Sequence, residues 1–517
     1  MPETVALTID GRPSSAPAGI TVAAALENAG ARACRTSVAG EPRGVLCAMG
    51  ICFECRVAVD GVPHRRACME IVRDGMRVDT KGEPGVSGAG PAVGAEALAC
   101  DVAVVGGGPA GVAAACRAAE SGARTVVLDE APSPGGQIYR HLSGAGAPDA
   151  ARPWLERLAR SGAAVRLGAA VFDAVAEDSG WKLSAETAAG LCVVRARRLV
   201  LATGARELFL PFPGWTLPGV MGAGGAQAMA KTGAELAGRT AVVAGSGALL
   251  LPVAATLAKK GVDVALVAEQ AGMASLAQFT AALCAFPGKL LEAARYRSAF
   301  FDTPYRAGVW VAEARGRGRL ESVVLTDGAA RFEVACDLAA VGYGLVPNTE
   351  LARLLGCATR AGTVAVDERQ ETSVPGVHCA GEPCGVAGVE VAIAEGQVAG
   401  LAAAARFDDA PDRQALAGAR VRGRRLAAAM QRAFRPRREL AAPVLPDTVV
   451  CRCEDARFAS LAACASVREA KLSSRAGMGP CQGRVCGPAL AFLFGWDSDT
   501  VRPPVKPARM GSLVVPE

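Results

Sequence analysis

Four cysteines near the N-terminus constrain this chain more than any other feature. They follow the spacing C-x4-C-x2-C-x12-C and are Cys47, Cys52, Cys55 and Cys68. The spacing is close to the plant-type pattern of a [2Fe–2S] site, in which thiolates converge on one side of a loop and backbone N–H groups point at the sulfurs. Small residues such as Ala48 and Gly50 permit that approach. We therefore predict a [2Fe–2S] cluster here.

Two alternatives stay open for these thiols, a zinc site and inert buried cysteines. Zinc favours two C-x2-C pairs, and this segment has one. A Rieske centre needs two His ligands, and the chain has only three histidines, His64, His141 and His378. Cys34 lies outside the spacing, and we interpret it as a core thiol.

A second group of cysteines lies near the C-terminus. It consists of a C-x-C pair and a C-x4-C pair that are separated by two short helical patterns: Cys451, Cys453, Cys481 and Cys486. This segment resembles the [2Fe–2S] domain of bacterioferritin-associated ferredoxins, and the resemblance implies a second cluster. A zinc site or unmetallated core cysteines are the alternatives, and Cys464 is interpreted as a core residue.

The chain has 517 residues, too many for one hydrophobic core, so we expect several domains. The fold class is α/β multidomain, with a β-grasp ferredoxin-like domain, a flavoprotein with two dinucleotide-binding domains, and a small helical [2Fe–2S] domain. The expected boundaries are 1–82 for the first cluster domain, 83–99 for a linker, 100–225 with 351–405 for the FAD domain, 226–350 for a degenerate NAD(P)-type domain, 406–445 for an Arg-rich helical linker, and 446–505 for the second cluster domain.

A glycine-rich turn follows the apolar strand that begins near residue 101. The pattern G-x-G-x-x-G is formed by Gly106, Gly108 and Gly111 and also contains Pro109 and Ala110. A helix follows, and then a second strand that ends at Asp129 and Glu130. Glycines in this context let a pyrophosphate meet the backbone and the helix N-terminus, and an acid about twenty residues on binds a ribose hydroxyl. Asp129 is the first choice for that acid and Glu130 the second.

Three further segments resemble the two-dinucleotide-domain flavoprotein disulfide reductases. They are Gly136-Gln137, Ala202-Thr203-Gly204 and Gly381-Glu382. In that family such segments close over FAD, and an acid after the glycine holds the ribityl chain. Glu382 stands where the family usually has Asp. The resemblance implies FAD, with NAD or ATP as alternatives at the same site.

A second strand-loop-helix pattern begins near residue 240. Gly245 and Gly247 are present, but Leu250 stands where the third glycine is expected. The basic residues that would bind a 2′-phosphate are absent from the "EQAGMAS" that follows the next strand. We therefore expect a dinucleotide fold that has lost NADPH, and we recognise no redox disulfide next to the flavin site.

The whole layout resembles hydrogen cyanide synthase and opine oxidase, with the small cluster subunit of those systems fused to the larger one. The α subunit of heterotetrameric sarcosine oxidase and the dye-linked proline or hydroxyproline dehydrogenases are also similar, and "RAGMGPCQGRVCGP" is the most specific shared segment. The resemblance implies an oxidoreductase subunit that acts on CH–NH or CH–NH2 groups.

In such a complex an amine is oxidised to an imine in a partner subunit of the FAD-dependent amino-acid oxidase type. Electrons then pass through flavin and two [2Fe–2S] clusters to a respiratory acceptor, and FMN at the partner interface is a further expectation. We identify no catalytic residues in this chain. A stand-alone NAD(P)H-dependent ferredoxin-type reductase and a non-redox nucleotide-binding scaffold are the alternative functions.

Charge and hydropathy limit the other partners. The net charge of +6 comes without an aromatic-basic motif, so we expect no nucleic acid. The N-terminus lacks a signal-peptide pattern and the apolar runs are too short to span a bilayer, so we expect a cytoplasmic protein. Residues 413–438 form an Arg-rich amphipathic segment, interpreted as a solvated linker helix. A peripheral contact with the inner membrane or a quinone is the alternative.

Overall fold

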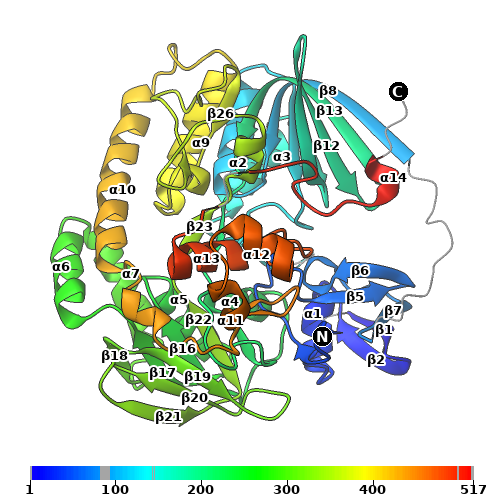
Figure 1. The fold of residues 1–517 in the computed structure, drawn as a ribbon. Coiled ribbons are helices and arrows are strands. Elements are labelled where there is room, and N and C mark those ends of the chain that lie inside the picture. Colours follow the sequence, from blue (N-terminus) through cyan, green and yellow to red (C-terminus); the bar gives the residue numbers. More distant parts are fainter. Residues whose placement is uncertain (1–2, 82–93, 143, 145, 498–499, 514–517) are drawn as a thin grey trace.

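The computed structural model describes residues 3–81, 94–142, 144, 146–497 and 500–513. Figure 1 shows the N-terminal domain packed beside two larger sheet domains, with the C-terminal helices lying between them. Residues 83–93 of the predicted linker lie outside the described residues. From Gly94 the chain already belongs to strand β8 (Gly94–Val105), so the last part of that predicted linker is strand instead.

The N-terminal domain is a five-stranded sheet with the order β2-β1-β7-β5-β6. Its elements are β1 (Thr4–Ile9), β2 (Arg12–Pro17), α1 (Val22–Asn28), β5 (Arg56–Val59), β6 (Val62–Arg66) and β7 (Met76–Asp79). Thr21 caps α1 by accepting a bond from the Ala24 N–H. Short strands β3 (Arg35–Thr36) and β4 (Pro42–Arg43) precede the cysteine loop, and the 3-10 turn η1 (Ala67–Met69) carries Cys68.

The first nucleotide domain is built on a seven-stranded sheet in which β10, β9, β8, β13 and β26 run parallel. Its strands are β8, β9 (Thr125–Asp129), β10 (Ala164–Leu167), β11 (Ala170–Glu177), β12 (Gly180–Thr187), β13 (Gly190–Leu201) and β26 (Val377–Cys379). Helices α2 (Pro109–Glu120), α3 (Arg152–Arg160) and α9 (Val389–Ala403) belong to this domain. Gly396 and Gly400 let α9 approach α2, because a Cβ on Gly400 would lie 2.2 Å from the Ala114 carbonyl oxygen.

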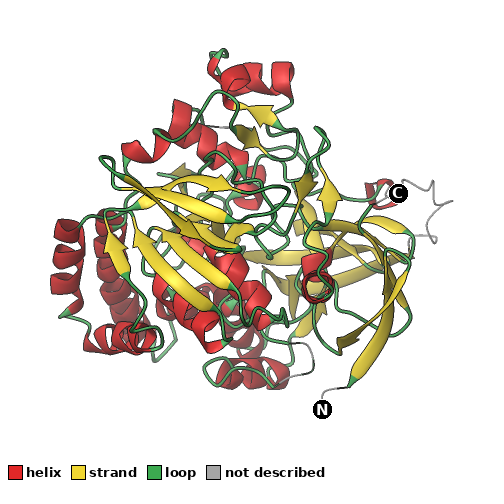
Figure 2. Ribbon diagram, turned by 90° about the horizontal axis from the view of Figure 1, so that it is seen from below, coloured by secondary structure: helices red, strands yellow, loops and turns green. Residues whose placement is uncertain are grey.

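The second domain contains a five-stranded parallel sheet with the order β15-β22-β16-β17-β18. Its strands are β15 (Val220–Gly222), β16 (Thr240–Gly245), β17 (Asp263–Glu269), β18 (Tyr305–Ala307) and β22 (Leu338–Gly342). A three-stranded sheet, β19 (Trp310–Arg315), β20 (Ser322–Thr326) and β21 (Arg331–Ala335), lies beside it (Figure 2). The helices are α4 (Ala223–Lys231), α5 (Leu250–Lys259), α6 (Met273–Leu283) and α7 (Pro287–Ser298). Because β15 belongs to this sheet, the domain begins earlier than the predicted residue 226.

Two short strands join the two nucleotide domains, β14 (Ala205–Glu207) and β23 (Leu345–Pro347). After the return to the first domain come α8 (Glu350–Leu354), β24 (Thr359–Arg360), β25 (Thr363–Val364) and η2 (Glu382–Cys384), and residues of α8, β25 and η2 pack into its core. Strands β14 and β23 pair antiparallel and form the connection through which the chain enters and leaves the second domain.

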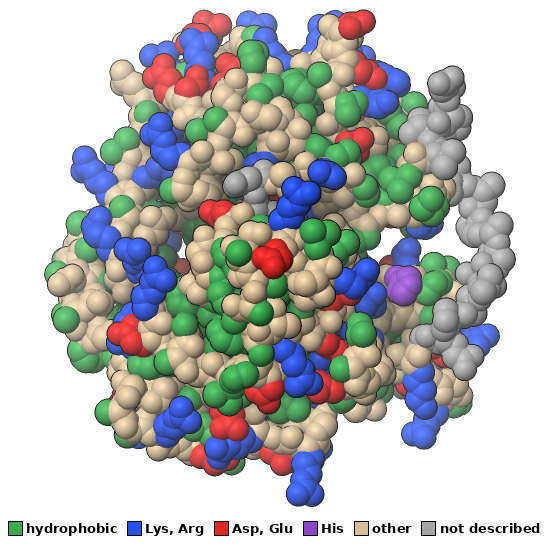
Figure 3. Space-filling model, in the orientation of Figure 1, with side chains coloured by type: hydrophobic (Ala, Val, Ile, Leu, Met, Phe, Trp, Pro, Cys, Tyr) green, Lys and Arg blue, Asp and Glu red, His purple; other side chains and the backbone are tan. Residues whose placement is uncertain are grey.

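The C-terminal part begins with the longest helix, α10 (Arg413–Ala433), which packs against α9 and α6. It continues through η3 (Arg438–Ala441), β27 (Val449–Cys451), β28 (Ala456–Arg457), α11 (Phe458–Ala462), α12 (Val467–Ser474), α13 (Cys486–Phe494) and α14 (Met510–Leu513). Lys and Arg side chains gather along the left side of Figure 3, where Figure 1 places α10. Within the described ranges, no helix is both long and apolar enough to cross a membrane.

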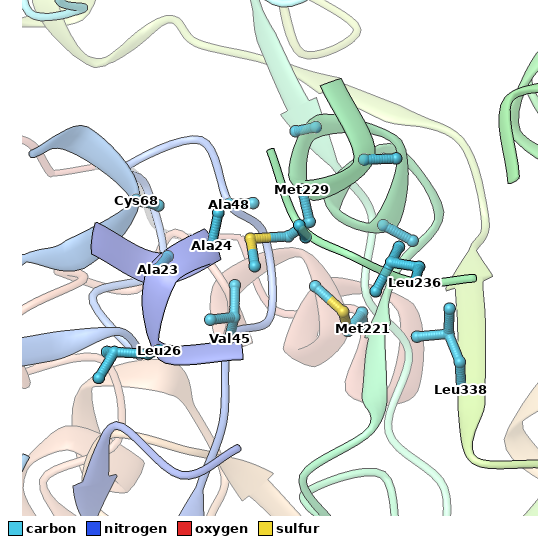
Figure 4. Packing of buried hydrophobic residues seen from close by; sticks show 14 of the residues in the cluster. Ala23, Ala24, Leu26, Val45, Ala48, Cys68, Met221, Met229, Leu236 and Leu338 are labelled. Atoms are coloured by element: carbon cyan, nitrogen blue, oxygen red, sulfur yellow. The ribbon is translucent and has the colours of Figure 1, made fainter. Parts of the chain in front are cut away.

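The domains share buried cores. Figure 4 shows Val45 on the side of the N-terminal domain that lies toward Met221 and Met229 of the second nucleotide domain, and Leu26 of α1 belongs to the same apolar cluster. A second cluster joins the cysteine loop of the N-terminal domain to the C-terminal cysteines and to Trp215. The N-terminal domain is therefore packed against the rest of the chain by apolar burial as well as polar contacts.

Candidate functional site

The first cysteine loop presents backbone donors to sulfur, as its spacing predicts. The N–H groups of Met49 and Cys52 both donate to Cys47 Sγ at 3.4 Å, and the Glu54 N–H donates to Cys52 Sγ at 3.5 Å. Burial raises the pKa of Cys47, but hydrogen bonds from the Cys52 thiol and from backbone N–H groups outweigh it and lower the pKa to about 6. These bonds favour the thiolate at Cys47 alone, because burial and the neighbouring thiols raise the pKa values of Cys52 and Cys55 well above the ordinary value.

The four N-terminal cysteines are all buried and form two pairs. Cys47 hydrogen-bonds Cys52, and Cys55 hydrogen-bonds Cys68. Gly50 lies beside the loop at a φ of +80°, and a Cβ there would lie 2.8 Å from Met69 Sδ. The chain can fold tightly around the thiols here because this position is glycine.

The four C-terminal cysteines are also buried and form two pairs. Cys451 hydrogen-bonds Cys486, and Cys453 hydrogen-bonds Cys481. The bond from Cys486, together with backbone N–H groups, lowers the pKa of Cys451 to about 7 against the effect of burial. Gly479 permits the loop, because a Cβ there would lie 2.2 Å from Cys453 Cβ.

Pairs of thiols suit two iron atoms better than one zinc ion. A zinc site needs four ligands around one point, whereas each iron of a [2Fe–2S] cluster takes two cysteines. The donor sets of both loops fit such a cluster. Cys34 and Cys464 belong to none of these pairs. Cys34 lies in an apolar core, and burial raises the pKa of its thiol to about 12.

A cavity of about 370 Å³ opens at the ends of strands β8, β9 and β13. Most of the predicted nucleotide-binding residues line it: Gly106, Gly108, Pro109, Ala110, Asp129, Glu130, Gly136, Gln137, Ala202, Thr203, Gly204, Gly381 and Glu382. Gly111 is not among the lining residues. A Cβ on it would lie 1.7 Å from the Gly106 carbonyl oxygen, so this glycine allows α2 to pack against the turn. The sequence therefore located one connected cavity from segments far apart in the chain.

Asp129 holds the glycine-rich turn in place. Its Oδ2 accepts from the Gly107 N–H at 2.6 Å, and its Oδ1 accepts from the Ala131 N–H at 2.8 Å. Burial raises the pKa of Asp129 to about 6, although the backbone bonds oppose the shift. Each carboxylate oxygen has a second lone pair, so the group can also accept a ribose hydroxyl.

Glu130, the second choice for the ribose-binding acid, lines the cavity and is held by two cations. Its Oε1 lies 2.7 Å from Lys506 Nζ, and its Oε2 lies 3.1 Å from an Arg66 guanidinium nitrogen. Burial opposes ionisation, but the two cations outweigh it and lower the pKa of Glu130 to about 2. The carboxylate thus joins the N-terminal domain and the C-terminal segment at the cavity edge.

Residues from both cysteine loops line the same cavity, which sequence reasoning missed. Met49 and Ile51 come from between Cys47 and Cys52, and Arg484 comes from between Cys481 and Cys486. Arg66 and Arg140 support the first loop by donating to the carbonyl oxygens of Gly50 and Ala48. The available signal was Arg140, which directly follows the "GGQIY" segment and had no assigned role.

A segment of the chain itself crosses the nucleotide edge of the second domain, beside a cavity of about 760 Å³ that Gln270, Gly272 and Arg437 line. Ser246, between the two glycines of that turn, donates its hydroxyl to the Phe434 carbonyl oxygen at 2.8 Å. Gln270 donates to the Arg435 carbonyl oxygen at 3.2 Å and to Ser246 Oγ at 2.8 Å. The segment after α10 therefore lies over the glycine turn where a pyrophosphate would approach.

A C-x4-C pair beside the flavin site was overlooked in the sequence. Cys379 and Cys384 flank the Gly381-Glu382 segment, and their side chains hydrogen-bond one another. Burial raises the pKa of Cys379 well above its usual value, so the thiol is a poor nucleophile. Both sulfurs lie in the apolar core under β26, and neither residue lines the cavity.

Comparisons with known proteins agree with this architecture. Residues 100–396 match the family model of the pyridine nucleotide-disulphide oxidoreductases, and residues 2–83 match that of the 2Fe-2S iron-sulfur cluster binding domain. The fold and the cavity thus define a flavoprotein-type α/β chain joined to a [2Fe–2S] domain.

The larger part of the chain has close relatives. It is 32% identical over 451 residues to the opine oxidase A subunit of Rhizobium meliloti, covering 80% of this chain and 98% of that protein. It is 33% identical over 433 residues to hydrogen cyanide synthase subunit HcnB of Pseudomonas aeruginosa, covering 77% of this chain and 92% of that protein. The chain belongs to the family of HcnB and the opine oxidase A subunit, which confirms the resemblance seen in the sequence.

Two further matches complete the comparison. Hydrogen cyanide synthase subunit HcnA of Pseudomonas aeruginosa is 45% identical over 73 residues, which are 14% of this chain and 70% of that protein. The crystal structure of L-proline dehydrogenase from P. horikoshii superimposes with a TM-score of 0.75 at 20% identity, covering 99% of this chain and 98% of the other. The fold therefore extends over the whole chain.

Proposed function

We propose that this chain is the electron-transfer subunit of a multi-subunit dehydrogenase that acts on amino acids or opines. The amine is oxidised to an imine in a partner subunit of the FAD-dependent amino-acid oxidase type. One observation carries the proposal: the loops of both cysteine groups contribute to the wall of a single nucleotide cavity. A redox cofactor bound there would lie next to both cluster sites, as a chain of electron carriers requires.

The proposal assigns a [2Fe–2S] cluster to each cysteine group. Cys47, Cys52, Cys55 and Cys68 hold the first in a β-grasp domain, and Cys451, Cys453, Cys481 and Cys486 hold the second in a small helical domain. The observed pairing of the thiols and the backbone N–H donors support both sites. All eighteen cysteines of the chain are free, which suits a reducing compartment and supports a cytoplasmic location.

The proposal places FAD in the cavity, with NAD or ATP as alternatives. When bound, a flavin accepts an electron pair and releases single electrons. Gly108 leaves the turn open, because the nearest atom to a Cβ there would be Gly136 Cα at 3.9 Å. Asp129 orients the turn and can bind a ribose hydroxyl, and the Glu382 carboxyl, which lines the same cavity and whose pKa is raised by burial, would hold the ribityl chain.

The contacts of the second domain count against NAD(P)H as the electron source. Phe434 and Arg435 accept bonds from Ser246 and Gln270 at the place where the cofactor would bind. Electrons must then come from a partner, and FMN at the partner interface would fit that route. A respiratory acceptor is the proposed destination, and the Arg-rich surface of α10 is the candidate for a peripheral membrane or quinone contact.

Metal and cofactor analysis tests the proposal. We expect about four iron and about four acid-labile sulfide per chain, together with one extractable nucleotide. Cys52→Ser and Cys481→Ser should each remove about half of the iron and leave the spectroscopic signal of the other cluster in place. Zinc instead of iron, or bleaching of the lone chain by NADH or NADPH, would contradict the assignment.

A further inference from the structure

One ion pair connects the two cysteine loops directly. Glu54 lies between Cys52 and Cys55, and Arg452 lies between Cys451 and Cys453. An Arg452 guanidinium nitrogen lies 3.0 Å from Glu54 Oε2, and Nε donates to the same oxygen at 3.1 Å. The side chains of Glu54 and Arg452 are 1% and 2% exposed. The contact is therefore fully buried, and each of its residues lies between two ligands of a cluster.

The Glu54 carboxylate and the Arg452 guanidinium also contact other residues at this junction. Arg35 donates to Glu54 Oε1 at 2.7 Å and to the Arg452 carbonyl oxygen at 3.0 Å. Arg452 also donates to the Trp215 carbonyl oxygen at 2.7 Å, and its guanidinium carbon lies 4.8 Å from the centroid of the Trp215 ring. Residues of the N-terminal domain, the flavoprotein part and the C-terminal domain thus meet at Arg452.

A second buried ion pair supports the first. An Arg43 guanidinium nitrogen lies 2.7 Å from Asp455 Oδ1, and the Ala39 N–H donates to Asp455 Oδ2 at 2.8 Å. The Arg43 and Asp455 side chains are 1% and 7% exposed. The C-x-C loop is therefore held against the N-terminal domain at two points, three residues apart.

The packing of the cysteines shows which sides of the two sites face each other. Cys47 and Cys52 belong to the apolar cluster that also contains all four C-terminal cysteines. Cys55 and Cys68 belong to a different cluster, around α1. Of the two thiol pairs in the first loop, the pair Cys47 and Cys52 therefore lies toward the second site.

Stability alone does not explain a charged contact at this position. Burying two ions costs several kcal/mol each, and apolar residues of similar volume are often as stabilising. A guanidinium that meets a carboxylate through two donors instead fixes distance and orientation. The pair thus defines one relative position for two loops whose separation would govern electron transfer.

We propose that electrons pass directly between the two clusters across this contact, and that Glu54 and Arg452 are its positioning residues. This inference rests on the proposed function, which supplies the second cluster. In each step one cluster would lose one electron and be oxidised while the other gains that electron and is reduced, and no covalent bond forms or breaks. The exchange does not require the nucleotide cavity, although both loops also line it.

Electron paramagnetic resonance of the fully reduced chain tests whether the sites are in contact. We expect splitting or broadening that is absent from the sum of the spectra of Cys52→Ser and Cys481→Ser, which each retain one cluster. About four iron per chain with a spectrum equal to that sum would overturn the inference alone. About two iron in the unmodified chain would overturn the second cluster and the inference with it.

Variants of the ion pair test the positioning role. Arg452→Met leaves Glu54 buried next to Arg35 alone, and the double variant Glu54→Gln with Arg452→Met removes both charges. We expect both to keep about four iron per chain and to lose the inter-cluster splitting, while the double variant melts closer to the unmodified chain. Arg452→Lys should retain part of the splitting, because it keeps the charge without the fork.

Arg475→Met is the matched control. Arg475 also pairs with a Glu next to a cluster ligand, at 2.8 Å from Glu454 Oε2, but it is exposed and lies within the C-terminal domain. We expect this variant to keep the full splitting. An unchanged splitting in the Glu54 and Arg452 variants, or an equal loss in Arg475→Met, would overturn the positioning role.

Discussion

Gly108 offers the sharpest test of the nucleotide cavity at the scale of one residue. It is the N-cap of α2, its φ is −74°, and no protein atom lies closer than 3.9 Å to the position of a Cβ. Gly108→Val should therefore fold normally but place its side chain in the path of a pyrophosphate. We expect the purified variant to contain little or none of the nucleotide found in the unmodified chain, and to retain its iron.

Gly272→Val provides the matched control for that substitution. Gly272 is the N-cap of α6 in the second domain, its φ is −75°, and nothing lies within 4 Å of a Cβ there. We expect full nucleotide content and a melting temperature close to that of Gly108→Val. Loss of nucleotide in both variants would place the ligand outside the predicted turn.

Glu269 should make stability depend on pH. It ends β17 as Asp129 ends β9, and it accepts from the Gly247 and Ala271 N–H groups at 2.8 Å. Burial raises its pKa from 4.5 to about 7. Between these values the folded chain holds a proton that the unfolded chain releases, so stability falls as pH rises, by up to about 3 kcal/mol from this group.

Denaturant unfolding from pH 5 to pH 8 measures this effect. Glu269→Gln should reduce the pH dependence and leave the part that comes from Asp129. It should also lower stability at every pH, because an amide cannot accept from both N–H groups. Asp178→Asn, at an exposed position, is the control and should keep the original slope. Identical slopes in all three proteins would show that Glu269 is not the group responsible.

At the same scale, the sequence predicted residue types better than residue roles. Cysteine spacing and the glycine turn follow from local chemistry, so they could be located without a structure. The different contacts of Asp129 and Glu130 could not be predicted, because the partners of Glu130 are Arg66 and Lys506. Those residues lie in other domains, and their proximity depends on tertiary packing.

At the scale of elements, the contact between α2 and α9 should tolerate no added volume. Gly400 is buried in α9, and a Cβ there would lie 2.2 Å from the Ala114 carbonyl oxygen, which belongs to the backbone and cannot turn aside. Gly400→Ala should therefore cost about 1–3 kcal/mol of unfolding free energy and weaken nucleotide retention, because α2 carries the turn.

Gly418→Ala should have the opposite effect on stability. Gly418 is an exposed residue of α10 with nothing within 4 Å of a Cβ. Alanine there should stabilise the chain by up to about 1 kcal/mol through helix propensity. Chemical denaturation of both variants measures the two changes in unfolding free energy. A loss of stability in Gly418→Ala equal to that in Gly400→Ala would contradict the packing argument.

The segment after α10 illustrates what an element-by-element interpretation of sequence leaves out. Leu250 suggested a degenerate second site, and the suggestion rested on crowding at the helix. The structure offers another physical cause, because Phe434 and Arg435 bond to Ser246 and Gln270. The helical character of residues 413–433 was predictable from amphipathic spacing. Its end point over the second domain depends on long-range packing that no local pattern encodes.

At the scale of the whole molecule, the domain order was predictable while the domain contacts were not. Each domain has its own motif, so its presence follows from sequence alone. The contacts between Glu54 and Arg452, or between the Asn28 amide and the Gly233 carbonyl oxygen, join residues hundreds of positions apart. The fusion of the first domain to the larger part agrees with these contacts, since separate chains would have to form the same interface by association.

The isolated chain should lack dehydrogenase activity. Residues of the two cysteine loops line the first nucleotide cavity, and Phe434, Arg435 and Arg437 form hydrogen bonds to the nucleotide edge of the second domain. Electrons should therefore enter from a partner that oxidises the amine. In stopped-flow mixing, sarcosine, proline, hydroxyproline, glycine or an opine should leave the isolated chain oxidised. Once a flavoprotein subunit of the amino-acid oxidase type is added, the cognate substrate should bleach the visible absorbance of this chain.

The partner without this chain is the control, and it should reduce its own flavin but not a one-electron acceptor. Rapid bleaching of the lone chain by any of these amines would make it a complete dehydrogenase and would require a substrate site within its own cavity.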